Sequence, residues 1–166
     1  MKENHLCSQL SWKNGDFPSI FNRCICEEKK CREKSRIKWD PRRGNFIHIR
    51  VDGCIDTEGK KCDCIIFFSS PKIKKCIAFI IEFKSKSYHL SEVREKLQES
   101  MNMLKSCLDN IDQIIAYPVI YADSHSSLQK RALLSYRVTW QRPILIKLLN
   151  WGDDICKASQ HIFPER

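Results

Sequence analysis

Glycine, long apolar runs and acidic charge are all scarce in this chain of 166 residues. Five glycines are too few for a collagen-like chain or a linker-like sequence. No apolar run approaches the roughly 20 residues that a membrane-spanning helix needs. The polar N-terminal stretch lacks the apolar segment of a signal peptide. We therefore expect a soluble, cytoplasmic protein without a membrane partner.

The shortage of acidic residues leaves a basic chain, with 20 Asp+Glu against 29 Lys+Arg and a formal net charge of +9. Such an excess favours a polyanionic partner, either nucleic acid or an anionic membrane surface. Hydrophobic residues at 42% and charged residues at 30% are typical of a globular protein. A chain of this length is most simply one domain, spanning residues 1–166.

Cysteine, in contrast, is abundant, with ten residues. This density is commoner in secreted, disulfide-linked chains, but those chains are usually shorter and poorer in core. Many of the cysteines lie in periodic segments, where cysteine packs as a small hydrophobic side chain. We expect reduced, buried thiols at these positions, among them Cys24, Cys64, Cys76 and Cys107.

A zinc site is the weaker alternative for the N-terminal cysteines. It would use Cys24, Cys26 and Cys31, joined by Cys7 or His5. The spacing differs from that of the usual zinc knuckle.

Hydrophobic periodicity predicts one α/β domain. A helix begins near Asp16 and continues to about Arg36. Alternating segments over residues 45–55, 62–68 and 77–84 are joined by turn-rich connections and predict a three-strand antiparallel meander. An amphipathic helix follows from about Ser91, and a crossover leads into a parallel strand over residues 114–122. The expected core is residues 16–121 in a mixed sheet flanked by helices, with an elaboration at 122–166.

Charged residues interrupt the end of the most apolar strand, IAFIIEFK. Glu82 and Lys84 share one face of this strand because residues two apart point the same way. Asp63 begins the preceding strand and brings a second carboxylate. Buried charges are costly unless they are paired or bound to a metal. Two carboxylates suit Mg²⁺, and Mn²⁺ can substitute for it.

Asp63 and the run Glu82-Phe83-Lys84 on an apolar strand resemble the PD-(D/E)XK nuclease superfamily, which has the restriction-endonuclease-like fold. The order of elements from about Asp16 to Tyr121 is also similar to that family. The resemblance implies that Asp63 and Glu82 bind the metal, that the Phe83 carbonyl adds a ligand and that Lys84 assists a Mg-activated water. Cys62 stands where the motif has a proline.

The resemblance also implies two residues on helices. Glu28, on the apolar stripe of the first helix, is the best match to a helical glutamate that often completes the metal shell. Gln98 matches a glutamine that many members place near the phosphate. The implied activity is a metal-dependent nuclease, an endonuclease by preference, with DNA favoured over RNA.

Two other interpretations stay open for the site. Glu82 and Lys84 can form an ion pair where the strand reaches solvent, or the fold can bind nucleic acid without catalysis. A homodimer is also left open.

Lysine and arginine are dense between Lys29 and Arg43. This stretch is either a solvated surface or a ridge that contacts phosphates beside the active site. The residues expected to bind nucleic acid, with Trp39 available for base stacking, are Lys38, Trp39, Arg42, Arg43 and Lys86.

Overall fold

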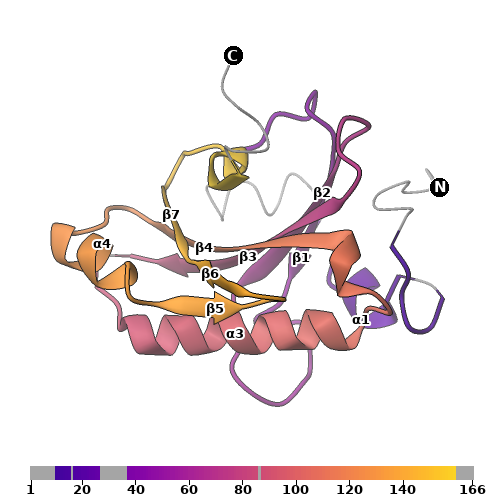
Figure 1. Cartoon of the computed structure of the whole chain (residues 1–166), viewed down its shortest axis with the longest axis horizontal. Helices are drawn as coiled ribbons and strands as arrows, with labels where there is room; N and C mark the ends of the chain where they lie inside the picture. Colours follow the sequence, from indigo (N-terminus) through magenta and orange to yellow (C-terminus); the bar gives the residue numbers. More distant parts are fainter. Residues whose placement is uncertain (1–9, 16, 27–36, 86, 160–166) are drawn as a thin grey trace.

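A five-stranded mixed sheet forms the centre of the computed structural model (Figure 1). The structure describes residues 10–15, 17–26, 37–85 and 87–159. Strand order is β1-β2-β3-β4-β7. The bounds are β1 Asn45–Arg50, β2 Cys64–Ser69, β3 Cys76–Lys84, β4 Ile114–Ala122 and β7 Lys147–Asn150.

The antiparallel meander and the parallel crossover are both confirmed. β1 pairs with β2, and β2 with β3, in antiparallel register. The helix α3, Leu90–Ser106, carries the chain across one face so that β4 joins β3 in parallel. The α/β class and the mixed sheet follow directly from these pairings. β7 adds a fifth strand, parallel to β4, within the segment 122–166 that the sequence predicted only as an elaboration.

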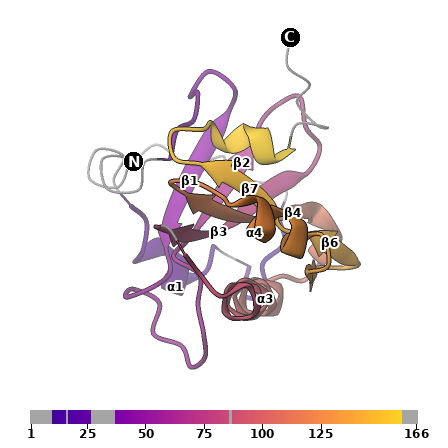
Figure 2. The same ribbon diagram turned by 90° about the vertical axis from the view of Figure 1, so that its left-hand side faces the viewer.

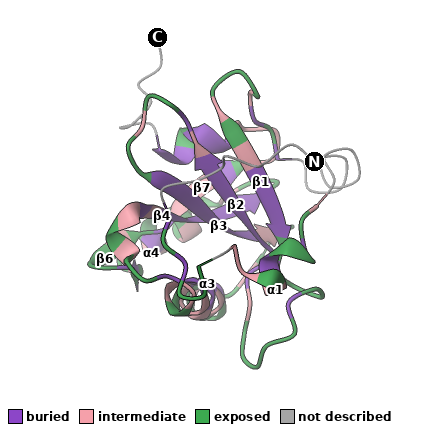
Figure 3. Cartoon of the chain, turned by 90° about the vertical axis from the view of Figure 1, so that its right-hand side faces the viewer, coloured by how far each residue is buried: buried purple, intermediate pink, exposed green. Residues whose placement is uncertain are grey.

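Each face of the sheet has its own apolar cluster, because successive strand residues point to opposite sides. Viewed along α3, the helix lies below the sheet and the 3₁₀ helix η2, Ile155–Ser159, lies above it (Figure 2). The α3 face buries Ile65, Phe67 and Ile80, whereas the opposite face buries Ile66 and Phe79. The strands are buried and the connecting loops are largely exposed (Figure 3). The sheet is therefore a rigid base for side chains at its ends.

The remaining elements pack around this base. The short helix α4, Ser127–Leu133, begins at a capping box formed by Ser126 and Gln129. It leads to a two-stranded ribbon, β5 Arg137–Thr139 and β6 Pro143–Leu145, and β5 contacts α3. A 3₁₀ helix η1, Ile111–Gln113, precedes β4.

The expected long first helix is wrong. α1 covers only Ser19–Asn22, and the chain then lies extended against the edge of β1. The N–H of Cys26 donates to His48 O at 2.8 Å, and the N–H of Arg50 donates to Cys24 O at 2.9 Å. Pairing with a strand edge uses the backbone groups that a helix would need internally.

The cysteines are only partly reduced. Cys24 forms a disulfide with Cys54, and Cys26 and Cys76 are also disulfide-bonded. The expectation of free thiols is thus wrong for Cys24 and Cys76. It is confirmed for Cys64, which is buried, and for Cys107, which is half-buried. A zinc site that uses Cys24 is excluded, because a disulfide sulfur is no longer a thiolate ligand.

Within the described residues, no helix is long and apolar enough to cross a membrane.

Candidate active site

Asp63 and Glu82 lie close together at the same end of the neighbouring strands β2 and β3. The register of β2 with β3 ends at Cys64, which pairs with Ile81, and the N–H of Asp63 donates to the O atom of that same Ile81 at 3.0 Å. Glu82 points to the α3 face of the sheet, where it contacts Lys96, and the Asp63 carboxyl group is near enough to interact with both. The two carboxyl groups therefore face one space, between the end of β3 and α3.

Glu82 is deeply buried and is held by two lysines. Its side chain is 1% exposed, and its Oε1 atom lies 2.8 Å from Lys84 Nζ and 2.9 Å from Lys96 Nζ. Lys84 and Lys96 are 21% and 24% exposed, so both ammonium groups lie between the buried carboxylate and solvent. The cost of burying Glu82 as an ion is offset by these partners.

Asp63 is fixed by the backbone of the motif strand. The N–H of Phe83 donates to Asp63 Oδ2 at 2.6 Å. Burial raises the pKa of Asp63 to about 6, and the negative charge of Glu82 adds to this rise. The Phe83 N–H and the Lys96 ammonium oppose it. A carboxyl group that titrates near pH 6 binds a proton or a cation readily.

The donor set fits a hard divalent cation. Among the described residues, no hydrogen-bond donor reaches the buried Oε2 atom of Glu82. This oxygen and the Asp63 carboxyl provide anionic oxygen ligands, which Mg²⁺ prefers. No group of three or more His, Cys, Asp or Glu side chains suited to a metal occurs within the described residues. The site therefore fits a cation held by two carboxylates and water, as Mg²⁺ commonly is, rather than an all-protein cage.

Lys96 is the site residue that sequence reasoning missed. It lies on α3, one turn after Val93 and next to Leu97, both of which are buried against the sheet. Residues three apart lie on the same side of a helix, so the flank of the apolar stripe could have indicated it. Lys96 also has a raised pKa: burial alone would lower it, but the hydrogen bond and charge of Glu82, with Asp63, outweigh burial.

Gln98 is not brought into this site. Its amide forms two hydrogen bonds with the backbone of Thr139 on β5, at 2.7 and 2.9 Å. Two residues beyond Lys96, it points roughly 200° around the helix. The side chain of Gln98 instead joins α3 to β5. Glu28 and Lys86 lie outside the described residues, and the helix proposed to carry Glu28 ends at Asn22.

Trp39, in the described part of the expected basic ridge, lies away from the carboxylates. Trp39 is only 8% exposed and belongs to the apolar cluster on the face opposite α3, where its ring stacks on Phe46 at 5.5 Å. Phe46 pairs with Phe68, five residues along β2 from Asp63, which is about 16 Å. The expectation that Trp39 is available to stack on a base is therefore wrong.

The cations near Trp39 remain on the surface. Lys38 and Arg43 are exposed, and Arg42 is 89% exposed and paired with Asp40 at 3.0 Å. The turn that carries Arg42 and Arg43 continues to Gly44, where an added Cβ would clash with Ser69 O. The turn at residues 41–44 therefore lies beside the turn between β2 and β3, which carries exposed Lys72, Lys74 and Lys75. These lysines and Arg42 lie toward the end of the sheet opposite Asp63, whereas the backbone of Lys38 pairs with Asp154 just after β7.

Together the fold and the site define an α/β protein with a buried carboxylate pair, flanked by two lysines, at one end of a mixed sheet. Comparison with family models, curated proteins and solved structures finds no match to the chain.

Proposed function

We propose that the chain is a metal-dependent nuclease of the PD-(D/E)XK type, with a restriction-endonuclease-like fold, that hydrolyses phosphodiester bonds of nucleic acid. The observation that carries the proposal is the pair of neighbouring carboxylates, Asp63 and Glu82, beside the Lys84 and Lys96 ammonium groups. The unpartnered Oε2 atom of Glu82 supports a cation there.

Asp63 and Glu82 would hold Mg²⁺, or Mn²⁺ in its place, and the Phe83 carbonyl is a candidate third ligand. The cation would supply Lewis acidity toward the phosphodiester and lower the pKa of water. Lys84 is part-exposed at the end of β3, so its ammonium can contact a phosphate or the attacking water. Lys84 and Lys96 place fixed positive charge where negative charge grows during in-line attack.

A second candidate function is nucleic-acid binding without catalysis. The observation that favours it is the double ion pair on Glu82, which balances this carboxylate without a metal. The pair does not form at a solvated strand end, because Glu82 is 1% exposed. The orphaned Oε2 atom and the neighbouring Asp63 favour the enzyme, since an ion pair alone requires neither.

A divalent-metal titration with labelled nucleic acid tests the proposal. We expect cleavage that depends on Mg²⁺ or Mn²⁺, is absent in EDTA and is abolished in Glu82→Gln, a variant that keeps the shape of the side chain. Binding of uncleaved nucleic acid should persist in the variant, because a carboxylate near phosphate repels it when no metal is bound. Single- and double-stranded DNA and RNA should be compared, with DNA the expected substrate. Metal-independent binding without cleavage would support the second candidate instead.

The cellular compartment is a separate part of the proposal. The Cys24–Cys54 disulfide favours an oxidising compartment over the cytoplasm that the sequence led us to expect, because cytosolic thiols are kept reduced.

A further inference from the structure

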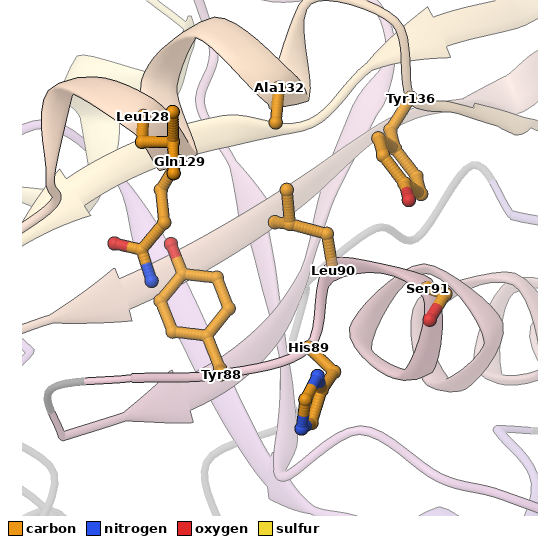
Figure 4. A pocket seen from close by; sticks show the side chains of 8 residues that line it. All are labelled: Tyr88, His89, Leu90, Ser91, Leu128, Gln129, Ala132 and Tyr136. Carbon is orange, nitrogen blue, oxygen red and sulfur yellow. The ribbon is translucent and has the colours of Figure 1, made fainter.

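A pocket of about 280 Å³ opens between the start of α3 and α4 (Figure 4). It lies at the end of the sheet where β3 and β4 finish. Leu90 and Ala132 form its apolar floor, and Tyr88 and Tyr136 stand on either side (Figure 4). Its remaining lining residues are His89, Ser91, Leu128 and Gln129.

The Tyr88 ring is fixed in place before any ligand binds. The His125 Nε2 atom lies 2.9 Å from Leu149 O, a carbonyl that can only accept, so Nε2 carries the proton. In the neutral ring, Nδ1 is then the acceptor, and the Tyr88 hydroxyl donates to it at 3.0 Å. β7 thus holds Tyr88 through His125, and a ligand that stacks on this ring meets little ordering cost.

Gln129 places a polar group at the edge of the pocket. Its Oε1 atom accepts from the N–H of Ser126 at 3.0 Å in the capping box. This hydrogen bond turns the amide so that its nitrogen points toward the Tyr88 side of the pocket (Figure 4). The amide N–H groups can donate to a ring nitrogen or a carbonyl.

The lining residues select the kind of ligand. None of the eight described residues around the pocket is a lysine, arginine, aspartate or glutamate, although the chain carries +9. A phosphate or a metal ion therefore lacks a charged partner here. Two aromatic rings, an apolar floor and an amide donor suit a flat, neutral ring with polar edges, and purine and pyrimidine bases have this chemistry.

We propose that this pocket holds one unpaired base of the nucleic acid whose backbone lies at the carboxylate site. The inference rests on the proposed function. Tyr88 follows Lys84 by four residues, so the two are at most about 14 Å apart along the chain. A base can enter the pocket only when it is unpaired, and the protein prefers single strands or frayed ends over intact duplex.

Binding measured in EDTA tests the pocket independently of cleavage. The probes are a short labelled single-stranded DNA, the same strand with one abasic position moved along it, and the strand annealed to its complement. Stacking on an aromatic side chain is worth about 1–3 kcal/mol per base, so one abasic position should weaken binding by roughly 5- to 150-fold. The duplex should bind more weakly than the intact strand.

Two variants and a control locate the effect. Tyr88→Leu removes the stacking ring, and Ala132→Leu fills the pocket from α4 if the first variant folds poorly. Either should abolish the difference between intact and abasic strands while leaving the salt dependence of binding unchanged. Leu134→Ala is the control, because Leu134 is 66% exposed at the end of α4 and does not line the pocket.

The outcomes separate this proposal from the nuclease. Base-dependent binding without metal-dependent cleavage would support the pocket and overturn the enzyme. Cleavage with equal binding of intact and abasic strands, or variants that keep the parent's preference, would overturn the pocket alone. A parent that binds no strand would overturn both.

Discussion

Asp63 combines a raised pKa with a fixed position. Burial and the Glu82 carboxylate raise the pKa of Asp63, although the Phe83 N–H opposes them, so this carboxyl group gains a proton more easily than it would in water. The folded protein therefore binds this proton more tightly than the unfolded chain does. In the metal-free protein, the stabilising contribution of Asp63 is fully present below its unfolded pKa and is lost as pH rises through about 6.

The first prediction uses Asp63→Asn, which cannot ionise. Relative to the parent, the variant should gain free energy of unfolding as pH rises from about 4 to about 6, and the difference should then level off. Urea unfolding in EDTA across this range measures it. Mg²⁺ should stabilise the parent more than the variant near neutral pH, because the parent binds the cation. If the difference in free energy of unfolding between parent and variant did not change with pH, the pKa of Asp63 would not be raised in the folded protein.

Lys96 provides the second prediction at the scale of the residue. Its Nζ atom contacts the same oxygen of Glu82 as Lys84 does, so removing it frees that carboxylate to turn. Misplacement of a catalytic group by about 1 Å can cost 10²-fold, and we expect Lys96→Gln to lower cleavage by about 10- to 100-fold.

The control for this variant is Lys105→Gln, because Lys105 is also on α3 but contacts Thr139 O. Lys96→Arg should recover part of the activity, which a change that only unfolded the protein would not allow. Cleavage by Lys96→Gln at the parental rate would remove Lys96 from the site.

At the scale of elements, α3 is fastened to the sheet beside the active site. The Ser100 hydroxyl accepts from the N–H of Cys62 at 2.8 Å, and Ser100 is 1% exposed. Cys62 directly precedes Asp63, so this hydrogen bond sets the start of β2 as well as the helix.

The third prediction compares two serines of α3. Ser100→Ala leaves the buried Cys62 N–H without its partner and should lower the free energy of unfolding by about 1–3 kcal/mol. Ser106→Ala, at the exposed end of the same helix, should change it by less than about 0.5 kcal/mol. Denaturant unfolding of both variants measures the contrast. Equal losses would mean that the Cys62 N–H finds water when the hydroxyl is absent.

Local sequence patterns were sufficient to predict some helices and strands but not others. The sequence predicts β4 and most of α3 because a long apolar run and a repeated apolar stripe dominate those segments. The helix expected after Phe17 fails because its apolar stripe at Cys24 meets a strand edge and a disulfide partner 30 residues away. The contacts of Gln98 were not predictable, because a motif gives sequence spacing but not the direction of the side chain.

That Asp63 and Glu82 lie at the same end of neighbouring strands was predictable, because a meander with short turns brings the start of β2 beside the end of β3. The positions of Lys96 and Trp39 were not predictable from the sequence. They depend on how α3 and the segment before β1 pack on the two faces of the sheet, which the alternation of apolar residues does not specify.

At the scale of the whole molecule, the Cys24–Cys54 disulfide ties the N-terminal segment to the loop after β1. The sequence separation of 30 residues closes a loop whose entropy loss in the unfolded chain corresponds to about 3–4 kcal/mol. The fourth prediction is that Cys24→Ala with Cys54→Ala loses stability of this order. Cys107→Ala, which removes a half-buried free thiol, should cost less. Denaturant unfolding measures the free energy of unfolding of the double variant and of Cys107→Ala. Similar losses in the two would show that the cross-link is not the source of the stabilisation.

The same segment has a consequence for assembly. β1 is an edge strand, and edge strands offer unpaired backbone groups on which a second chain can add a strand. Residues 24–26 occupy those groups along the second half of β1, through Cys26 N–H to His48 O and Arg50 N–H to Cys24 O. The Cys24–Cys54 disulfide fixes one end of this segment against the loop after β1. Reduction of the disulfide would free residues 24–26 to leave the edge of β1. A reducing environment should therefore promote self-association through β1 before the sheet unfolds.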